Sequence, residues 1–434
     1  MFTSTIFASI LPEILILVLA ILILVVEPFW KEEKRRNVGW LTASGLLAVM
    51  VVSLLFGQPG EPTTTLGGMV RFDWLGFFFK MLFMFAGAAT ALLFMDNEKI
   101  GHRGEAYLLL LASLLGMNLM AASADLVMLY LAIETTSIPL YVLSGFMLAD
   151  NKSTEAGFKY LLFGALTSTV MLYGFSLLYG FTGTTDIYAL ASLPKGLFLG
   201  VVFLLIVGLG FKVSVVPFHF WAPDVYEGAP TPVTGFLSTV SKAAGFAVLL
   251  RLFMVAFPLD AQMWSLIFAI LSTITMTLGN LLALAQKNLK RMLAYSSIAH
   301  AGYIMVGVAA IYNSEASLSE LGVSSVVFYL VAYIVTNLLA FGIVTAYGRV
   351  VGSDEIASYN GLSRRHPWLA FAMLIGFLSL AGMPPFGGFI AKVLVFAAAV
   401  KVGLVWLAVV GILNSIVGVY YYLIVLKHVY LYRD

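Results

Sequence analysis

Five ionisable side chains lie inside long apolar stretches of this chain: Glu134, Lys159, Lys212, Lys242 and Lys392. Lys212, for example, interrupts the run LIVGLGFKVSVVPFHFW. A charge inside a bilayer is costly unless it is paired or hydrated, so it is by default a candidate functional group. Burial shifts the pKa of a lysine readily, and a buried lysine can release its proton near neutrality. The residue types therefore predict a membrane protein that moves charge.

The composition supports a membrane location. The chain has 434 residues, of which 61% are hydrophobic and 11% charged, and its mean hydropathy is +0.99. Soluble domains carry about 25% charged residues, so the sequence predicts an all-α polytopic membrane protein. The chain contains no cysteine, which excludes disulfides, thiolate metal sites, iron–sulfur ligation and a cysteine nucleophile. It also lacks the glycine-rich patterns GxxxxGK[ST] and GxGxxG that hold nucleotides.

A spanning helix needs about 20 apolar residues, and on this measure the sequence predicts thirteen spans with short connections. The predicted spans are 6–29, 38–57, 72–95, 105–123, 125–148, 155–181, 196–220, 231–257, 261–283, 291–312, 321–349, 367–400 and 403–428. Most lysines and arginines of the connections then lie on one side of the membrane, and only Arg71, Lys195 and Lys401 lie on the other. Because basic loops stay in the cytoplasm, we expect the N-terminus outside and the C-terminus inside.

Two of the predicted spans contain helix-breaking residues. Pro217 follows Lys212 in the seventh span, and the twelfth carries AGMPPFGGFIAK ahead of Lys392. Proline removes a backbone donor and clashes with the preceding turn, so we expect both helices to unwind locally. Unwound backbone at membrane depth survives only where it is buried in protein or lines a wet cavity. Both lysines are therefore predicted to lie beside polar breaks.

The spacing of the two breaks predicts an inverted repeat. They lie five spans apart, and a unit with an odd number of spans must be inverted relative to its copy. Inverted repeats with broken helices are typical of secondary transporters. We expect a three-helix segment over 1–104, a first five-helix repeat over 105–257, and a second repeat with the C-terminal tail over 261–434.

Glu134 is the carboxylate that we expect deepest in the membrane, about 15 Å into its helix. A nearby ammonium would favour its charged form, and the preferred interpretation is a Glu134–Lys212 pair whose strength changes during a working cycle. The alternative is a static ion pair that fixes two helices. Lys212, Lys242 and Lys392 are further predicted to form a row that passes protons through intervening water.

The remaining polar candidates each have a structural alternative. Lys159 lies near the end of its helix and could instead extend to the membrane surface. His300 is suited to relaying protons, or is a neutral histidine bonded to a neighbouring hydroxyl. His219, Asp224 and Glu227 are candidates to line the inner entrance of the proton path. Alternatively, the two acids belong to the solvated face of a loop.

Three other charged residues are predicted to reach water. Lys80 and Arg251 lie towards the outer ends of their helices, where a long side chain can extend to the membrane surface. Glu13 lies near the end of the first span, where we also expect contact with water.

Three long motifs, in this order, resemble one known family. GFKVSVVPFHFWAPDVYEGAPTPVTGFLSTVSKAAGF, NLKRMLAYSSIAHAGY and GMPPFGGFIAK look like the antiporter-like membrane subunits of respiratory complex I, the proton-pumping NADH–quinone oxidoreductase. The DVYEGAPTPVT run and the lysine after GGFIA favour the subunit N branch over the L and M branches. The resemblance extends over nearly the whole chain from the third span onward. That branch usually has a fourteenth helix, and this sequence ends after the thirteenth predicted span.

The resemblance implies both a function and its residues. Protons would move along a buried polar axis, driven by quinone reduction elsewhere in the complex. Partner subunits would bind NADH, FMN, iron–sulfur clusters and quinone, and this chain would carry no cofactor or metal. Its partners would be other membrane-arm subunits, including a homologous antiporter-like subunit, in the lipid of a bacterial plasma membrane. The matching residues are Glu134, Lys159, Lys212, Lys242 and Lys392.

Two alternatives share this fold. One is a subunit of a multisubunit Na+/H+ antiporter, and the other is the membrane arm of a related hydrogenase or photosynthetic-type quinone reductase.

Overall fold

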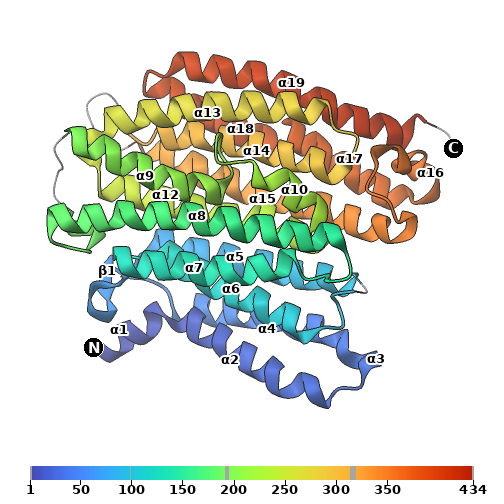
Figure 1. The fold of residues 1–434 in the computed structure, drawn as a ribbon, viewed down its shortest axis with the longest axis horizontal. Coiled ribbons are helices and arrows are strands. Elements are labelled where there is room, and N and C mark those ends of the chain that lie inside the picture. The colour runs from blue at the N-terminus through green and yellow to red at the C-terminus, as the bar shows by residue number, and fades with distance from the viewer. Residues whose placement is uncertain (1, 98, 191–194, 313–318, 433–434) are drawn as a thin grey trace. The chain divides into compact units, whose positions relative to one another are not determined.

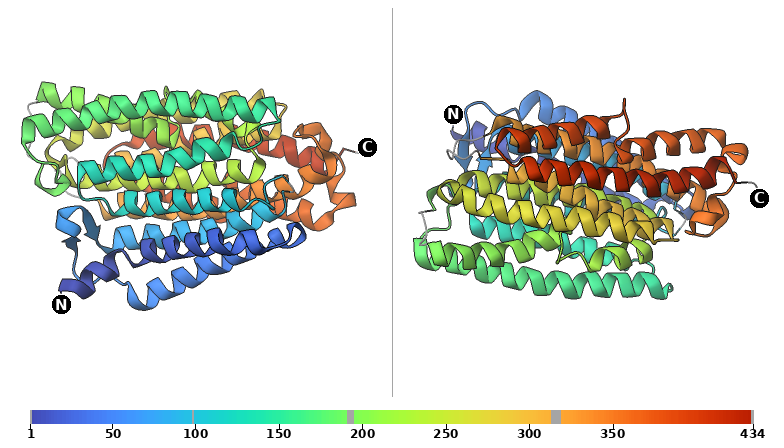
Figure 2. Two further views of the ribbon diagram at one scale, coloured as in Figure 1. Left: turned by 60° about the horizontal axis from the view of Figure 1, so that its bottom comes forward. Right: turned by 90° about the horizontal axis from the view of Figure 1, so that it is seen from above.

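The computed structural model describes residues 2–97, 99–190, 195–312 and 319–432, and divides the chain into two compact units. Unit 1 comprises Met1–Leu209 and Gly228–Ala256, and unit 2 comprises Gly210–Glu227 and Phe257–Asp434. Within each unit the long helices run nearly parallel or antiparallel to one another (Figures 1 and 2). The predicted repeats and these units are different divisions, because a repeat is defined by internal symmetry and a unit by packing.

The N-terminal part of the chain, through the eighth helix, contains one short hairpin among its helices. Its elements are α1 (Phe2–Ser9), α2 (Leu11–Val26), α3 (Glu32–Arg35), α4 (Asn37–Phe56), β1 (Thr63–Thr65), β2 (Val70–Phe72), α5 (Trp74–Met95), α6 (Gly104–Ala122), α7 (Leu126–Ser144) and α8 (Asn151–Thr182). The strands are antiparallel, with Thr64 opposite Arg71. The hairpin departs from the predicted all-helical bundle, and it lies in the polar connection between α4 and α5.

The rest of the chain is helical over the described residues. Its helices are α9 (Lys195–Val213), α10 (Trp221–Gly228), α11 (Thr231–Phe236), a π-helical turn η4 (Leu237–Ser241), α12 (Lys242–Val255), α13 (Ala261–Leu284), α14 (Leu289–Ala309), α15 (Glu320–Val351), α16 (Leu362–Arg365), α17 (Pro367–Ala381), α18 (Gly387–Lys401) and α19 (Val405–Tyr430). Short 3-10 turns are η1 (Glu27–Phe29), η2 (Leu66–Gly68), η3 (Ile187–Ala189), η5 (Pro258–Asp260) and η6 (Ile356–Tyr359).

Among the described residues, eleven helices are long and apolar enough to cross a membrane. Two shorter apolar helices, Leu197–Val213 and Pro367–Ala381, belong to the two spans in which we predicted breaks. Nearly all residues of Thr231–Val255 and Leu289–Ala309 are buried, whereas most residues of Leu11–Phe29 are not. Helices that are enclosed by protein can carry polar side chains, and these two buried helices hold Lys242 and His300.

Short polar side chains start several of the spans. Asp73 accepts a hydrogen bond from the backbone N–H of Gly76 at the start of α5, at 2.8 Å. Asp125 caps α7 in the same way, and Asn288 caps α14 by accepting from the N–H of Arg291 at 3.1 Å. Each cap satisfies a backbone donor that the helix itself cannot satisfy, which sets where the span begins.

Candidate functional site

The first predicted break is present, directly after Lys212. The helix α9 ends at Val213, Ser214 takes a positive φ of 60°, and helix resumes at Trp221. Lys212 lies in the last turn of α9 and is only 4% exposed. The broken segment thus places the lysine inside the protein at a helix end.

The backbone of this break is satisfied within unit 2. The indole N–H of Trp221 donates to the carbonyl of Phe211 at 3.1 Å, and the N–H of Val216 donates to Thr275 Oγ1 at 3.0 Å. Ser214 Oγ and His219 Nδ1 are buried and have no hydrogen-bond partner among the described residues. Protein atoms therefore support the unwound chain, as membrane depth requires, and leave polar atoms that a water molecule could satisfy.

The second predicted break lies between α17 and α18. The helix α17 ends at Ala381, Gly382 follows with a φ of 81°, and α18 begins at Gly387. Lys392 Nζ donates to the carbonyl oxygen of Ala381 at 3.0 Å, and the lysine is 5% exposed. The carbonyl end of a helix favours a cation, so the broken end of α17 is a physical reason for the lysine to lie there.

Gly382 is a position where only glycine fits. A Cβ atom there would lie 2.8 Å from Lys392 Cδ and 3.1 Å from Nζ. Gly352 ends α15 with a similar φ of 68°, but a Cβ there would meet open space. The two glycines share the same backbone requirement and differ in the neighbouring lysine.

We expect Gly382→Ala to destabilise the chain more than Gly352→Ala. Alanine at a positive φ costs roughly 1 kcal/mol in either variant, and only Gly382→Ala also displaces the Lys392 side chain. The measurement is denaturant unfolding of the full chain in detergent. Equal losses in the two variants would mean that Lys392 is not confined by this break.

His300 lies at the centre of a buried group of tyrosines in unit 2. Its Nδ1 is 2.8 Å from the hydroxyl of Tyr329, and its Nε2 is 3.2 Å from the hydroxyl of Tyr422. The Tyr422 hydroxyl also makes a short hydrogen bond with Ser296 Oγ. A neutral imidazole has one donor and one acceptor nitrogen, so two hydroxyls can satisfy both of them and exchange protons with them. Both predicted interpretations of His300 remain compatible with this geometry.

The polar contacts continue from this histidine along the neighbouring helices. Tyr333 donates to Ser297 Oγ at 2.9 Å, and Tyr226 Oη lies 3.4 Å from the same oxygen. The Tyr333 ring lies 5.1 Å from the His300 ring, and Asn337 Nδ2 donates to the Tyr333 hydroxyl at 3.1 Å. The result is a buried set of hydroxyls and amides that connects α10, α14, α15 and α19.

Tyr303 lies between His300 and Lys392. The Lys392 ammonium is 4.8 Å from the centre of the Tyr303 ring, a cation–π contact, and that ring is 5.8 Å from the His300 ring. Asn280 Nδ2 donates to the Tyr303 hydroxyl at 2.9 Å and Tyr421 donates to Asn280 Oδ1 at 3.1 Å. Two of the predicted site residues, His300 and Lys392, are therefore neighbours of one tyrosine.

In unit 1, Glu134 lies on α7 and is half-buried. It accepts a short hydrogen bond from Ser168 Oγ of α8, which is also 3.4 Å from the Tyr130 hydroxyl. Lys159 forms an ion pair with Glu155 one turn earlier on α8, at 2.7 Å, and both are partly exposed. Glu134 belongs to unit 1 and Lys212 to unit 2, and the pair between them stays a prediction.

Lys242 follows directly on a π-helical turn. The turn η4 (Leu237–Ser241) interrupts the helix between α11 and α12, and Lys242 is 1% exposed. Ser238 and Thr239 of this turn donate to the carbonyl of Gly235 at 2.9 and 2.6 Å. Single π turns are rare and are frequent at functional sites. The hydroxyls of the segment STVSK that precede Lys242 are thus held by an irregular turn that the sequence did not reveal.

The prediction that Lys80 and Glu13 reach water is wrong. Lys80 Nζ lies 2.7 Å from Glu13 Oε1, and the side chains are 4% and 7% exposed. Lys80 Nζ also donates to the carbonyl of Ser9 at 2.9 Å. Position along a helix indicated a surface location, but the packing of α2 and α5 against their common neighbours α4 and α6 encloses both charges.

The same correction applies to Arg251, which is 4% exposed. Its guanidinium binds both oxygens of Asp73 at 2.8 Å and donates to the Ala121 carbonyl at 2.9 Å and the Tyr188 hydroxyl at 2.6 Å. Burial acts to raise the pKa of Asp73, but the bonds and charge of Arg251 outweigh it and hold the pKa below its usual value. Arg251 thus joins the ends of α5, α6 and α12 with η3.

Asp224 and Glu227, the candidates for an inner entrance, share one arginine. Arg291 Nη1 donates to Asp224 Oδ1 at 2.8 Å and to Glu227 Oε2 at 2.9 Å. Lys290 Nζ donates to the backbone carbonyl of Glu227 at 2.7 Å. The acids are therefore ion-paired rather than simply solvated, and they hold the short helix α10 to α14. Their role at an inner entrance stays a prediction.

Sequence reasoning missed most of the tyrosines and amides of unit 2. One local signal existed, since Ser296, Ser297, His300 and Tyr303 recur on α14 at spacings of three and four residues. Such a spacing places side chains on one helix face. The partners Tyr329 and Tyr422 lie on other helices and carry no comparable local signal.

Comparisons with known proteins indicate the same family as the three sequence motifs do. The family model described as "NADH:quinone oxidoreductase/Mrp antiporter, TM" matches residues 123–418. NADH-quinone oxidoreductase subunit N of Heliobacterium modesticaldum is 46% identical over 410 residues, 93% of this chain and 84% of that protein. Subunit N of Moorella thermoacetica is 45% identical over 427 residues, 96% of this chain and 87% of that protein.

Solved structures give the same result. A chain of respiratory complex I from Thermus thermophilus is 35% identical with a TM-score of 0.80, covering 98% of this chain and 90% of that one. A chain of an archaeal membrane-bound sulfane sulfur reductase is 26% identical with a TM-score of 0.81, covering 98% of this chain and 88% of that one. A chain of the Mrp complex from Dietzia sp. is 23% identical with a TM-score of 0.84, covering 100% and 81%, and shows a shared fold.

The matched region includes both helix breaks, Lys242, and His300 with its neighbours Tyr303, Tyr329 and Tyr333. On these grounds the chain belongs to the NADH:quinone oxidoreductase/Mrp antiporter family of membrane proteins, in the branch whose members are named NADH-quinone oxidoreductase subunit N.

Proposed function

We propose that this chain is a membrane-arm subunit of a NADH–quinone oxidoreductase and transfers protons coupled to quinone reduction elsewhere in the complex. Relatives that are 45 and 46% identical over nearly the whole chain carry that name. The observation that carries the mechanism is the buried polar group of unit 2, in which one tyrosine contacts both His300 and Lys392. Such a group offers protons a route through a helix bundle otherwise lined by apolar side chains.

The proposed path uses the lysines beside the irregular turns. A change in the charge or position of Glu134 alters the stability of the proton on Lys212. That proton passes through water and hydroxyls to Lys242 and then to Lys392, with His300 and its tyrosines as relays. The burial of these three lysines supports the assignment, since a lysine without bulk water can release its proton near neutrality. Lys159 is the weakest member, because it pairs with the exposed Glu155.

We place all redox chemistry in partner subunits. NADH, FMN, iron–sulfur clusters and quinone bind there, and this chain contributes proton transfer alone. Among the described residues there is no group of three histidine, aspartate or glutamate side chains that could hold a metal ion. The bacterial relatives support a bacterial plasma membrane location. The distribution of basic residues supports an N-terminus outside and a C-terminus in the cytoplasm.

Two alternative functions share this fold: a subunit of a multisubunit Na+/H+ antiporter, and the membrane arm of a related hydrogenase or photosynthetic-type quinone reductase. The Mrp antiporter chain and the sulfane sulfur reductase chain both superpose well on this one. Lysines suit protons and would repel Na+, and the high identity to subunit N proteins favours the quinone-reducing complex.

Isolation of the tagged chain from its native membranes tests the proposal. We expect it to co-purify with flavin- and iron–sulfur-containing subunits and with NADH–quinone reductase activity. Co-purification with antiporter subunits alone, or with hydrogenase subunits, would contradict it.

A further inference from the structure

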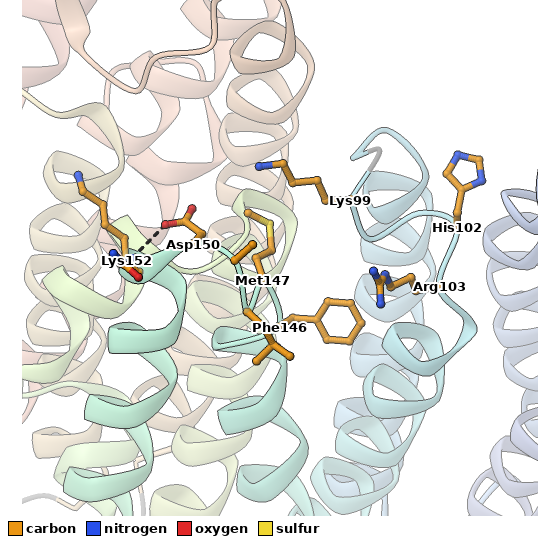
Figure 3. Close-up of a pocket in the computed structure, with 10 residues that line it drawn as sticks. Lys99, His102, Arg103, Phe146, Met147, Asp150 and Lys152 are labelled. Carbon is orange, nitrogen blue, oxygen red and sulfur yellow. Dashed lines mark hydrogen bonds between the residues drawn. The ribbon is translucent and has the colours of Figure 1, made fainter.

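A pocket at one end of unit 1 is lined by charges that the proposed proton path does not use. It has a volume of about 830 Å³ and lies between the connection from α5 to α6 and the connection from α7 to α8 (Figure 3). Lys99, His102 and Arg103 come from the first connection, and Lys152 comes from the start of α8. Four basic side chains therefore border one cavity.

Asp150, the single acid among the lining residues, caps a helix. Asp150 Oδ1 accepts the backbone N–H of Lys152 at 3.0 Å and so caps the start of α8. One capping carboxylate against Lys99, Arg103 and Lys152 leaves the pocket with an excess of positive charge. The helices α6 and α8 also begin at its border, and their positive dipole ends act in the same direction.

Much of the remaining wall of the pocket is apolar. Phe146, Met147 and Leu148 border it from the connection after α7, and Leu148 is 85% exposed. Figure 3 shows Lys99 and Arg103 on one side of the cavity and Phe146 and Met147 on the other. A simple anion site does not need apolar side chains. A molecule that carries a phosphate next to hydrocarbon uses both sides.

The pocket lies where the headgroup of such a molecule would be in a membrane. Both connections follow spanning helices and therefore lie at one end of the bundle, where lipid headgroups meet water. The distribution of basic residues assigns this end to the cytoplasmic side. Basic pockets between spanning helices on that side bind anionic lipid headgroups.

We propose that this pocket binds the phosphate of an anionic phospholipid, with Lys99 and Arg103 at the phosphate and the acyl chains beside Phe146 and Leu148. The site depends on the membrane location of the chain and not on the proposed proton path. A lipid held here joins α5–α6 to α7–α8, next to the helix that carries Glu134.

The absence of cysteine from the chain allows a clean test. Leu148→Cys in the full chain is labelled with a fluorophore, and the protein is reconstituted into nanodiscs with brominated phosphatidylglycerol or brominated phosphatidylcholine. We expect phosphatidylglycerol to quench at the lower mole fraction. Adding Lys99→Gln and Arg103→Gln should raise its half-quenching mole fraction about fivefold for each charge removed.

A matched control removes the same charge elsewhere. Lys31→Gln with Lys34→Gln removes two exposed lysines on the same predicted side that do not border the pocket, and quenching should be unchanged. Equal quenching by the two lipids, or an equal effect of both double variants, would refute a specific site. If phosphatidylglycerol quenches no better than phosphatidylcholine and inorganic phosphate alone changes the fluorescence, the pocket is an anion site without lipid and the proposal fails. If a photo-crosslinker attached to the cysteine of the Leu148→Cys variant captures a protein in native membranes, the pocket is a subunit contact instead.

Discussion

Lys212→Ala in the assembled complex is expected to lower the rate of coupled proton pumping at least about tenfold, because it removes a group that accepts and releases the transferred proton. Glu134→Ala should have a similar effect if the carboxylate controls the lysine's proton. The measurements are NADH-driven acidification of membrane vesicles and NADH oxidation in the same preparation. Assembly, followed by co-purification of the other subunits, should be retained.

Arginine at the same position separates proton transfer from a static ion pair. Lys212→Arg keeps the positive charge, but a guanidinium does not release its proton in a protein. We expect Lys212→Arg to fail in pumping as Lys212→Ala does. Recovery by arginine would mean that Lys212 only fixes two helices. Lys401→Ala, at the exposed end of α18, is the matched control and should pump normally.

Loss of one partner of the Glu13–Lys80 pair should produce the largest change in stability. Both side chains are buried, with Lys80 Nζ 2.7 Å from Glu13 Oε1. Lys80→Met therefore leaves the carboxylate of Glu13 buried without its cation. Such a loss typically costs about 3–5 kcal/mol. Glu13→Gln should be costly in the same way, because it leaves the ammonium unpaired. Denaturant unfolding of the full chain in detergent measures both variants.

The double variant and an exposed pair complete this test. Glu13→Gln combined with Lys80→Met removes both charges and should recover most of the lost stability. Lys159→Met breaks a partly exposed pair with Glu155 one helical turn away, which is worth only about 0.5 kcal/mol. If Lys80→Met and Lys159→Met cost the same, the Glu13–Lys80 pair stabilises the fold no more than a partly exposed pair does.

Much of the fold could be predicted because its causes are local. Apolar stretches of about 20 residues define spans, since a bilayer requires each helix to satisfy its own backbone hydrogen bonds. Pro217 and the pair Pro384–Pro385 cannot continue a helix, and both breaks lie where these residues predicted them. The buried lysines beside the breaks were also visible, because a charge in an apolar run needs no partner in order to be recognised.

The partners of those charges could not be predicted. Lys80 and Arg251 were expected to extend to the membrane surface, but they bind Glu13 and Asp73, residues far away in the chain. The choice between a surface and a buried location depends on which helix packs alongside. Hydropathy along one helix carries no information on its neighbour.

The sequence by itself determined the membrane class, the two breaks, the buried charged residues and the family resemblance, each of which depends on residues close together in the chain. Only the tertiary structure decided that His300 contacts Tyr329 and Tyr422, that Tyr303 lies against Lys392, and that a π-helical turn precedes Lys242. These features depend on packing between helices. A buried polar atom takes the partner that the assembled bundle brings within hydrogen-bonding distance, and that geometry is a property of the whole fold.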